Sequence, residues 1–333
     1  MKNYTWFDEP LKVFGIPFFY ESRTYERLPA DLREQVPSLK AHGRRCPGAR
    51  IGFRTDAESF TVKMVLRTLK PDPGMSIFAS QSIAVMAGER TTSRFLGVIN
   101  PPNYETKTVE KRFYKGKGME EVTLWMPRNE ILDMVEVSLP DEARIEPPTP
   151  YRYGKAVFYG SSITAGGCAA TVTNGHVARL SRLLDLDFYN LGFPGSARGE
   201  IEIADYINTL DMQLFILDYD HNAPTPEHLA NTHEAFFRRI REKHPTIPVL
   251  FLTRPDFEQT EETAARRAVV RATYERARAA GDENVYYLDG EAYFEKVDRQ
   301  LCSVDGIHPN DLGFYFMAEA ILPVMKDMLE SIS

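Results

Sequence analysis

The segment FYGSSITAGG, residues 158–167, carries two adjacent serines, Ser161 and Ser162, between a short apolar run and a glycine pair. An apolar run of this length predicts a strand that is buried on both faces, as in a parallel sheet covered by helices. Ligands of such sheets bind at the carboxyl ends of the strands. The two serines are therefore expected where chemistry takes place, and either one becomes a nucleophile only when a base takes its proton.

The same pattern continues through residues 151–333. Five apolar runs predict strands at residues 156–159, 188–191, 214–217, 249–252 and 285–288. Amphipathic stretches predict helices near residues 175–185, 199–210, 227–244, 260–280 and 311–331. Alternation of this kind predicts a three-layer α/β/α sandwich around a parallel five-stranded sheet. The loops that follow the strands should then converge on one edge of the sheet.

Residues 1–150 have a different pattern of apolar and polar residues. Alternating apolar and polar residues predict half-buried strands at 60–64, 122–126 and 135–139. Proline- and glycine-rich turns separate such runs, which indicates an antiparallel, jelly-roll-like β-sandwich with a short helix near residues 30–36. The stretch EPPTP at 146–150 is expected to be a linker, because proline fits neither a helix interior nor a central strand. We therefore predict two domains, 1–150 and 151–333.

The composition excludes several classes of function. The 333 residues carry a formal net charge of −7 without a long basic run, so a nucleic-acid partner is not expected. The three cysteines, Cys46, Cys168 and Cys302, form no CxxC pair, which favours free thiols and argues against a zinc site. Cys168 lies close to the serines and is expected to be a buried, inert thiol. No signal peptide or membrane-length apolar run is visible, so we expect a cytoplasmic protein without a membrane partner.

Histidine is the usual base for a serine nucleophile, because its pKa lies near neutral. Five of the seven histidines are expected away from the predicted strand ends. His228, His233 and His244 fall on or beside a predicted helix and are expected to be solvated. His176 lies near the start of another helix and is expected to be structural, whereas His42 belongs to the first half of the chain.

Two histidines remain near the predicted strand ends. His221 follows the third strand and is the weaker candidate. His308 lies in a glycine- and proline-containing loop before the last helix, three residues after Asp305. At that spacing the carboxylate can fold back onto the imidazole, fix its tautomer and stabilise the imidazolium. The alternative is an ordinary loop with a helix cap at Asn310 or Asp311.

Taken together, these segments resemble the SGNH or GDSL-like hydrolase family. The four sequence blocks of that family match, in order, residues 160–164, Gly195, Asn222, and the pair Asp305 and His308. The resemblance implies a flavodoxin-like hydrolase fold for the second half of the chain. It also implies a serine esterase that uses neither a metal nor an organic cofactor.

The resemblance assigns a role to each matching residue. Ser162 occupies the position of the nucleophile, His308 that of the base, and Asp305 that of the residue that orients the base. The oxyanion hole would consist of the backbone N–H groups of Ser162 and Gly195 and the side-chain amide of Asn222. Glycine is expected at position 195 because the backbone must approach the substrate closely.

The chain departs from the family pattern in two blocks. Ser161 stands where the family has aspartate, and its hydroxyl is expected to support the turn by a local hydrogen bond. Residues 220–223 read DHNA in place of the usual Gly-x-Asn-Asp, which leaves the accessory contacts of this loop open. Gly192 is a weaker alternative to Gly195 and is expected to serve the turn.

The first half of the chain, at residues 27–29 and 51–55, is similar to the β-sandwich of a bacterial subgroup of this family. That subgroup includes carbohydrate esterases that remove acetyl groups. The resemblance implies a small acyl ester, with an acetylated sugar or oligosaccharide as the preferred substrate. A lipase, a thioesterase, an acyltransferase and a non-catalytic carbohydrate-binding protein remain alternatives. No oligomeric state is predicted.

Other side chains near the predicted site leave two interpretations open. Tyr219 and Phe193 either stack on a sugar or pack the loops. Four charged residues at the same edge either bind substrate hydroxyls or pair with one another: Arg198, Glu200, Asp218 and Arg254.

Overall fold

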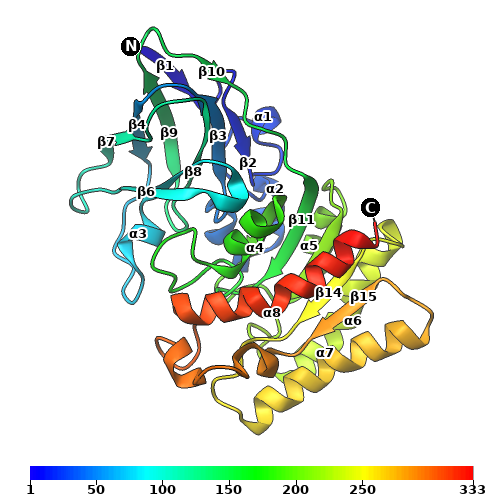
Figure 1. Cartoon of the computed structure of the whole chain (residues 1–333). Coiled ribbons are helices and arrows are strands. Elements are labelled where there is room, and N and C mark those ends of the chain that lie inside the picture. The colour runs from blue at the N-terminus through cyan, green and yellow to red at the C-terminus, as the bar shows by residue number, and fades with distance from the viewer. Residues whose placement is uncertain (333) are drawn as a thin grey trace.

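The computed structural model describes residues 1–332 (Figure 1). Two antiparallel sheets lie in the first half of the chain. One has the strand order β1 (Lys2–Thr5), β9 (Leu132–Leu139), β4 (Ser59–Leu66) and β7 (Thr108–Tyr114). The other has the order β10 (Ile145–Glu146), β3 (Arg50–Thr55), β8 (Glu120–Trp125), β5 (Ile83–Ala87) and β6 (Arg94–Ile99), with β2 (Lys12–Phe14) paired to β3.

The two sheets bury the apolar residues of their alternating strands between them. Phe60, Val62 and Met64 on β4 are buried, whereas Thr61 and Lys63 between them are only partly buried. Phe60 meets Phe53 of the opposite sheet at a ring-centroid distance of 5.8 Å. The predicted antiparallel sandwich is confirmed, and its three predicted strands coincide with β4, β8 and β9.

The second half of the chain forms one parallel sheet. Its strand order is β12 (Leu186–Gly192), β11 (Tyr153–Gly160), β13 (Leu214–Asp218), β14 (Val249–Leu252) and β15 (Val285–Leu288). In chain order this is 2-1-3-4-5, the flavodoxin-like arrangement. The predicted five-stranded parallel sheet is confirmed.

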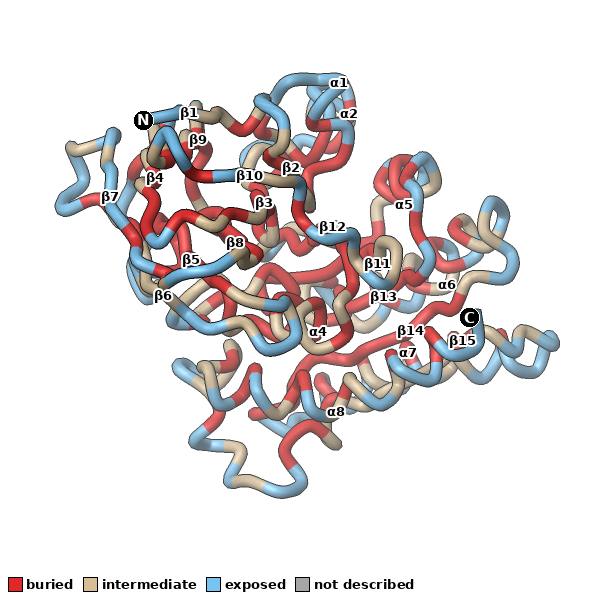
Figure 2. Tube along the Cα trace, turned by 45° about the horizontal axis from the view of Figure 1, so that its top comes forward, coloured by how far each residue is buried: buried red, intermediate tan, exposed pale blue. Residues whose placement is uncertain are grey.

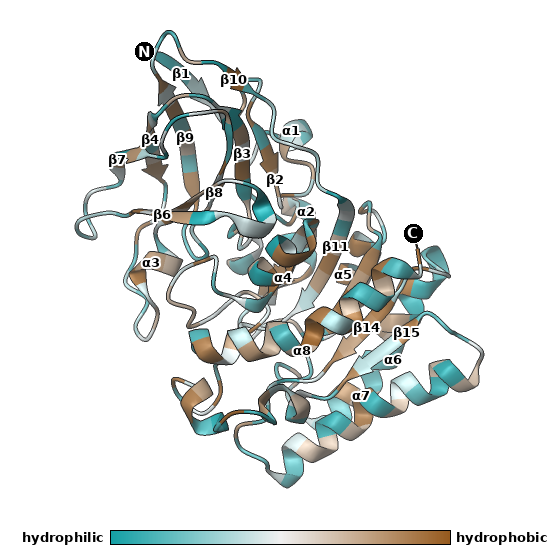
Figure 3. Cartoon of the chain, in the orientation of Figure 1, coloured by the Kyte–Doolittle hydropathy of each residue, from teal (hydrophilic) through white to brown (hydrophobic). Residues whose placement is uncertain are grey.

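Helices cover both faces of this sheet, because each strand is apolar on both sides. Phe158 packs with α4 (His176–Leu184) and α8 (Asp311–Glu330), and α8 crosses in front of the sheet in Figure 1. The adjacent Val157 packs on the other face with three more helices: α5 (Ile201–Ile207), α6 (Pro226–Lys243) and α7 (Glu261–Ala279). Figure 3 shows the resulting contrast between apolar strands such as β14 and the largely hydrophilic outer face of α7.

Capping side chains fix where the helices begin. Thr260 and Thr263 form a capping box at α7. Asn310 caps α8 by accepting a 3.0 Å hydrogen bond from the N–H of Gly313, so the loop before α8 ends where the sequence predicts. Within α6, His233 is buried and its Nδ1 lies 3.1 Å from Thr273 Oγ1, so the expectation of a solvated His233 is wrong. Among the described residues, no helix combines the length and apolar character needed to cross a membrane.

Short helices and turns complete the first half of the chain: α1 (Phe19–Ser22), α2 (Ala30–Gln35), α3 (Ile77–Ser80), η1 (Pro37–Leu39), η2 (His42–Arg44) and η3 (Arg90–Thr92). Two further turns, η4 (Gly290–Phe294) and η5 (Arg299–Cys302), precede α8.

The segment around α2 lies against the second half of the chain instead of inside the sandwich. Leu32 of α2 belongs to the same apolar core as α5 and α6. The Tyr206 hydroxyl of α5 donates a 2.7 Å hydrogen bond to the Arg27 carbonyl, and Arg27 Nη1 donates a 2.8 Å bond to the Asn190 carbonyl. Figure 2 shows buried stretches of chain both in the sandwich and in the parallel sheet, on the two sides of this junction. The two halves therefore share an extended buried junction.

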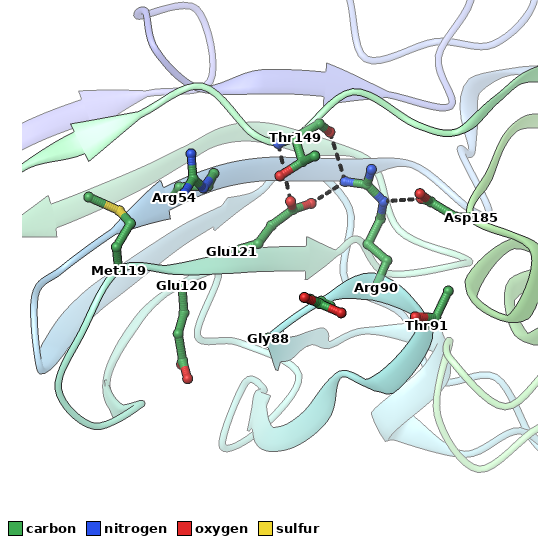
Figure 4. A pocket seen from close by; sticks show the side chains of 10 residues that line it. Arg54, Gly88, Arg90, Thr91, Met119, Glu120, Glu121, Thr149 and Asp185 are labelled. Carbon is green, nitrogen blue, oxygen red and sulfur yellow. Dashed lines mark hydrogen bonds and ion pairs between the residues drawn. The ribbon is translucent and has the colours of Figure 1, made fainter.

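A second part of the junction lies at the amino ends of the parallel strands (Figure 4). Arg90 pairs with Glu121 and donates to Asp185 Oδ1 at 2.6 Å, just before β12 begins. Its Nη1 and Nη2 also donate to the carbonyls of Thr149 and Pro150, at 2.9 and 2.8 Å. These contacts hold the proline-rich connection in place. Arg90, Glu121 and Asp185 also line a cavity of about 500 Å³. The cavity lies at the opposite edge of the sheet from the strand ends that carry Ser162.

His176 gives the fold a measurable sensitivity to acid. It is fully buried against Phe314, with a ring-centroid distance of 5.8 Å, and neither ring nitrogen has a partner within residues 1–332. Burial lowers the pKa of His176 to about 3, from 6.5 in the unfolded chain. Below pH 6.5 the unfolded chain therefore binds a proton that the folded protein excludes. The free energy of unfolding consequently decreases as the pH is lowered.

We expect His176→Phe to be more stable than the parent protein, because phenylalanine keeps the stack and adds no unpaired nitrogen. The margin should grow by about 2 kcal/mol between pH 7 and pH 5, since only the parent carries this proton linkage. Urea unfolding of both proteins at pH 7, 6 and 5 measures the margin. A margin that is the same at all three pH values would contradict the assignment.

Candidate active site

The carboxyl edge of the parallel sheet brings together side chains from distant parts of the chain. Ser162 follows β11, and His308 lies in the loop before α8. Ser162 Oγ is 2.9 Å from His308 Nε2, and His308 Nδ1 is 2.7 Å from Asp305 Oδ2. The three residues that the sequence predicts as a triad thus form one continuous hydrogen-bonded chain.

Local hydrogen bonds shape the loop that presents Ser162. The Ser161 N–H donates to Thr164 Oγ1 at 3.0 Å, and the Ile163 N–H donates to Ser161 Oγ at 3.1 Å. The predicted local role of the Ser161 hydroxyl is confirmed. Gly160 is required because a Cβ there would collide with Thr164. The turn therefore holds Ser161 inward and leaves Ser162 to face His308.

Backbone hydrogen bonds from the loop of His308 hold Asp305 in place. Its Oδ1 accepts hydrogen bonds from the N–H groups of Ile307 and His308, at 2.9 and 2.7 Å. Partial burial acts to raise the pKa of Asp305, but these bonds and the His308 imidazole outweigh it and hold the pKa below its usual value. An ionised Asp305 accepts a hydrogen bond from Nδ1–H of His308, which leaves the lone pair of Nε2 directed toward Ser162.

Two backbone N–H groups at the site have no acceptor among the described residues, those of Ser162 and Gly195. Gly195 has a φ of +62°, in the left-handed region, and nothing lies within 4 Å of the position of a Cβ. Glycine is thus favoured by its backbone conformation and not, as expected from the sequence, by close approach of the backbone to a substrate. The N–H of Gly192 already donates to Asn190 Oδ1 at 2.9 Å, so Gly192 has no donor to offer.

Asn222 is tied to the loop that carries Gly195. Its Nδ2 donates a 2.9 Å hydrogen bond to the carbonyl of Phe193, two residues before Gly195. An amide nitrogen carries two protons, so one anchors the loop and the other remains for a ligand. The three predicted oxyanion donors, from Ser162, Gly195 and Asn222, therefore belong to loops at one edge of the sheet.

Two buried carboxyl groups support these loops from behind. Asp218 Oδ2 accepts a 2.8 Å hydrogen bond from Thr164 Oγ1, which ties β13 to the Ser162 loop. Burial, with a smaller effect of Asp220, raises the pKa of Asp218 to about 8. Burial also raises the pKa of Asp220 to about 6, against the backbone hydrogen bond from Arg254. Asp218 is thus a structural support of the loop.

His221 is excluded as the base. Its Nδ1 lies 2.7 Å from Arg254 Nη1, and because a guanidinium only donates, this nitrogen must be the acceptor. Burial, together with the charges of Arg254 and His308, lowers the pKa of His221 to about 3. His221 therefore stays neutral with its proton on Nε2, and Arg254 is engaged with it and with Glu258.

The aromatic residues at the site pack the loops. Phe193 is fully buried under the guanidinium of Arg27, 4.2 Å from the ring centroid. Tyr219 is buried and its hydroxyl lies 2.8 Å from Thr232 Oγ1. Neither ring is available for stacking on a sugar. Glu200 accepts hydrogen bonds from the Tyr159 hydroxyl at 2.7 Å and from the N–H of Arg198 at 3.1 Å, so its carboxylate is engaged within the loop.

The first half of the chain contributes to the rim of the site, and no sequence pattern predicts this contribution. Ser76 Oγ donates a 2.7 Å hydrogen bond to the carbonyl of Ala170, and Arg128 Nη1 donates to that of Gly166. Cys168 Sγ lies 3.6 Å from Met75 Sδ and is half-buried, and burial raises the pKa of its thiol. In residues 1–332 no group of three His, Cys, Asp or Glu side chains could hold a metal ion.

Comparison with known proteins places this site in a family. The family described as GDSL-like lipase/acylhydrolase matches residues 154–326, and the N-terminal domain of SGNH-hydrolase-type esterases matches residues 4–145. No match to a curated protein was found.

Three solved structures show how widely the fold is shared. A Bacteroides ovatus protein described as GDSL-like lipase is 24% identical, with a TM-score of 0.86 over 99% of this chain and 98% of that one. The salicylyl-acyltransferase SsfX3 of a tetracycline biosynthetic pathway is 21% identical, with a TM-score of 0.80 over 98% and 97%. A family two carbohydrate esterase from Clostridium thermocellum, in complex with cellohexaose, is 14% identical, with a TM-score of 0.64 over 85% and 93%.

At these identities the solved structures bear on the fold alone. The family assignment rests on the match over residues 154–326, which covers just over half of the chain. The resemblance found in the sequence is confirmed: this protein belongs to the GDSL-like lipase/acylhydrolase family, and an N-terminal domain of the SGNH-hydrolase type precedes its hydrolase domain.

Proposed function

We propose that this protein is a serine esterase that hydrolyses small acyl esters through an acyl-enzyme. The observation that carries the proposal is the hydrogen-bonded chain from Ser162 Oγ through His308 to Asp305. Activation of this kind requires a nucleophile within hydrogen-bond reach of a base, and a third group that orients the base.

The proposed reaction uses these groups in turn. Ser162 Oγ attacks the ester carbonyl while His308 Nε2 takes its proton. The negative charge that develops on the carbonyl oxygen is stabilised by the amides of Ser162 and Gly195 and by Nδ2 of Asn222. His308 then protonates the leaving alkoxide, and the acyl group remains on Ser162. A water molecule, deprotonated by His308, attacks the acyl-enzyme and releases the acid.

An acetylated carbohydrate is the substrate that we favour. The support is the shared two-domain layout with carbohydrate esterases, one of which is described in complex with cellohexaose. The buried positions of Phe193 and Tyr219 mean that sugar binding would depend on polar groups and on the rim contributed by the first half of the chain.

Acyl transfer to an alcohol other than water is the second candidate. It is favoured by the higher TM-score to the salicylyl-acyltransferase, 0.80 against 0.64 for the carbohydrate esterase. The same acyl-enzyme serves both reactions, and only the group that attacks it differs.

The experiment that tests the proposal compares p-nitrophenyl acetate, butyrate and octanoate, followed by acetate release from acetylated cello- and xylo-oligosaccharides. We expect the highest kcat/KM for acetate and release of acetate from at least one oligosaccharide. The same assay with added alcohols measures transfer, since an acceptor alcohol would divert the acetyl group into a new ester. Absence of hydrolysis and of transfer with all of these esters would refute the proposal.

A further inference from the structure

A small cavity adjoins the Ser162 loop. Its volume is about 20 Å³, which is room for one water-sized particle. Gly166 of the Ser162 loop, Gly175 and Val177 at the start of α4, and Arg128 from the first half of the chain lie in its wall. The cavity therefore lies where three separate segments meet.

Arg128 brings an unpaired positive charge to this cavity. Its side chain is buried, with Nη1 donating to the Gly166 carbonyl and Nε donating to Asn129 Oδ1 at 3.0 Å. Nη2 is buried and has no partner among the described residues. Asp72 attracts Arg128 through space, but the hydrogen bonds of Arg128 within residues 1–332 go to Asn129 and Gly166, and no carboxylate forms an ion pair with it. A buried cation without a partner is costly, so a counter-ion at this position would be strongly favoured.

Arg27 shows what a satisfied buried arginine looks like in the same protein. It also lacks a carboxylate partner within the described chain, but all three of its nitrogens donate to backbone carbonyls. Those acceptors are the carbonyls of His42 and Asn190, at 2.8 to 3.2 Å. Arg128 differs in having one donor left over beside a cavity.

The start of α4 supplies further donors to the same place. Gly175 at the N-cap position has no side chain to cap the helix. The N–H groups of His176, Val177 and Ala178 have no acceptor within residues 1–332. Free N–H groups and the helix dipole make such an end favourable for an anion. Gly166, which accepts from Arg128, lies against Gly175, so the guanidinium and the helix end adjoin each other.

We propose that this cavity binds a single halide ion, chloride in the cell, between Arg128 Nη2 and the first turn of α4. The wall offers several donors and one uncompensated positive charge, which suits an anion better than a water molecule. The volume is too small for a phosphate or a carboxylate. The ion would join Arg128 to the first turn of α4, and Arg128 in turn holds the carbonyl of Gly166 in the loop that presents Ser162.

The test measures thermal unfolding at constant ionic strength while chloride or bromide replaces gluconate. For the parent protein we expect a saturable rise in Tm of about 2–3 °C once the halide is tenfold above its Kd. Arg128→Gln should abolish the rise. The matched variant Arg27→Gln removes another buried guanidinium and should keep it. A Tm that is the same in chloride and gluconate would overturn the proposal, as would an undiminished rise in Arg128→Gln.

Crystals of the parent protein grown or soaked in sodium bromide decide the matter if Arg128→Gln does not fold. An anomalous bromide peak within hydrogen-bonding distance of Arg128 Nη2 is the expected result. A cavity that holds only water in bromide would refute the halide site. Neither readout depends on esterase activity, so this proposal and the proposed function can fail separately.

Discussion

Ser162→Ala is expected to lower kcat/KM for p-nitrophenyl acetate by about 10⁴-fold or more. Alanine removes the oxygen that would form the acyl-enzyme, while the amides of Ser162 and Gly195 and the side chain of Asn222 remain in place. The residual rate should therefore be that of a binding site without a nucleophile. Parallel steady-state kinetics and a thermal unfolding curve would separate loss of chemistry from loss of fold.

Ser161→Ala is the matched control, because it makes the same chemical change one residue earlier. Ser161 Oγ accepts a hydrogen bond from the N–H of Ile163, and its loss should cost about 1 kcal/mol of stability. Since this hydroxyl is buried and does not contact His308, activity should fall by less than about tenfold. If Ser162→Ala keeps the parent rate, the nucleophile assignment is wrong. The non-catalytic carbohydrate-binding protein then becomes the favoured hypothesis.

The arrangement of the strands could be predicted because a strand that is buried on both faces is apolar along its whole length. Runs such as residues 214–217 are apolar throughout, since helices cover both sides of the sheet. Chain order and the strand-end rule then place Ser162, Asn222 and the loop of His308 at one edge. Backbone topology was therefore sufficient to bring the candidate site together.

Side-chain direction could not be predicted in the same way. Phe193 and Tyr219 lie in loops at the site, but a loop has no period that tells which side chain points inward. His233 was expected to be solvated, yet it falls on the inward stripe of α6. A count of positions from Leu229 and Phe236, four before it and three after it, would have indicated this.

No local sequence pattern predicts the contacts between the two halves of the chain. Arg128 is 38 residues from Gly166 in sequence, and Ser76 is 94 residues from Ala170. A lone arginine in a turn between strands has the appearance of a solvated residue. Its burial follows only from the packing of the sandwich against the Ser162 loop, which the sequence of either half does not contain.

Asp305→Asn is expected to lower kcat by about 10³- to 10⁴-fold, although the two side chains have nearly the same shape. The N–H groups of Ile307 and His308 both donate to Asp305 Oδ1, so an asparagine would keep its oxygen there. Its amide nitrogen would then face His308 Nδ1. Because an amide nitrogen only donates, Nδ1 would have to accept and the imidazole proton would move to Nε2. Nε2 would donate to Ser162 Oγ and could no longer take its proton.

Asp305→Ala separates the effect of the tautomer from that of orientation. Alanine removes the carboxylate but imposes no donor, and water can reach Nδ1 because the Asp305 side chain is 46% exposed. If Asp305 acts mainly by fixing the tautomer, the alanine variant should be more active than the asparagine variant in the same assay. If asparagine is the more active of the two, holding the ring in place matters more than choosing its proton. An asparagine variant with the parent kcat would mean that His308 does not depend on Asp305 as a base.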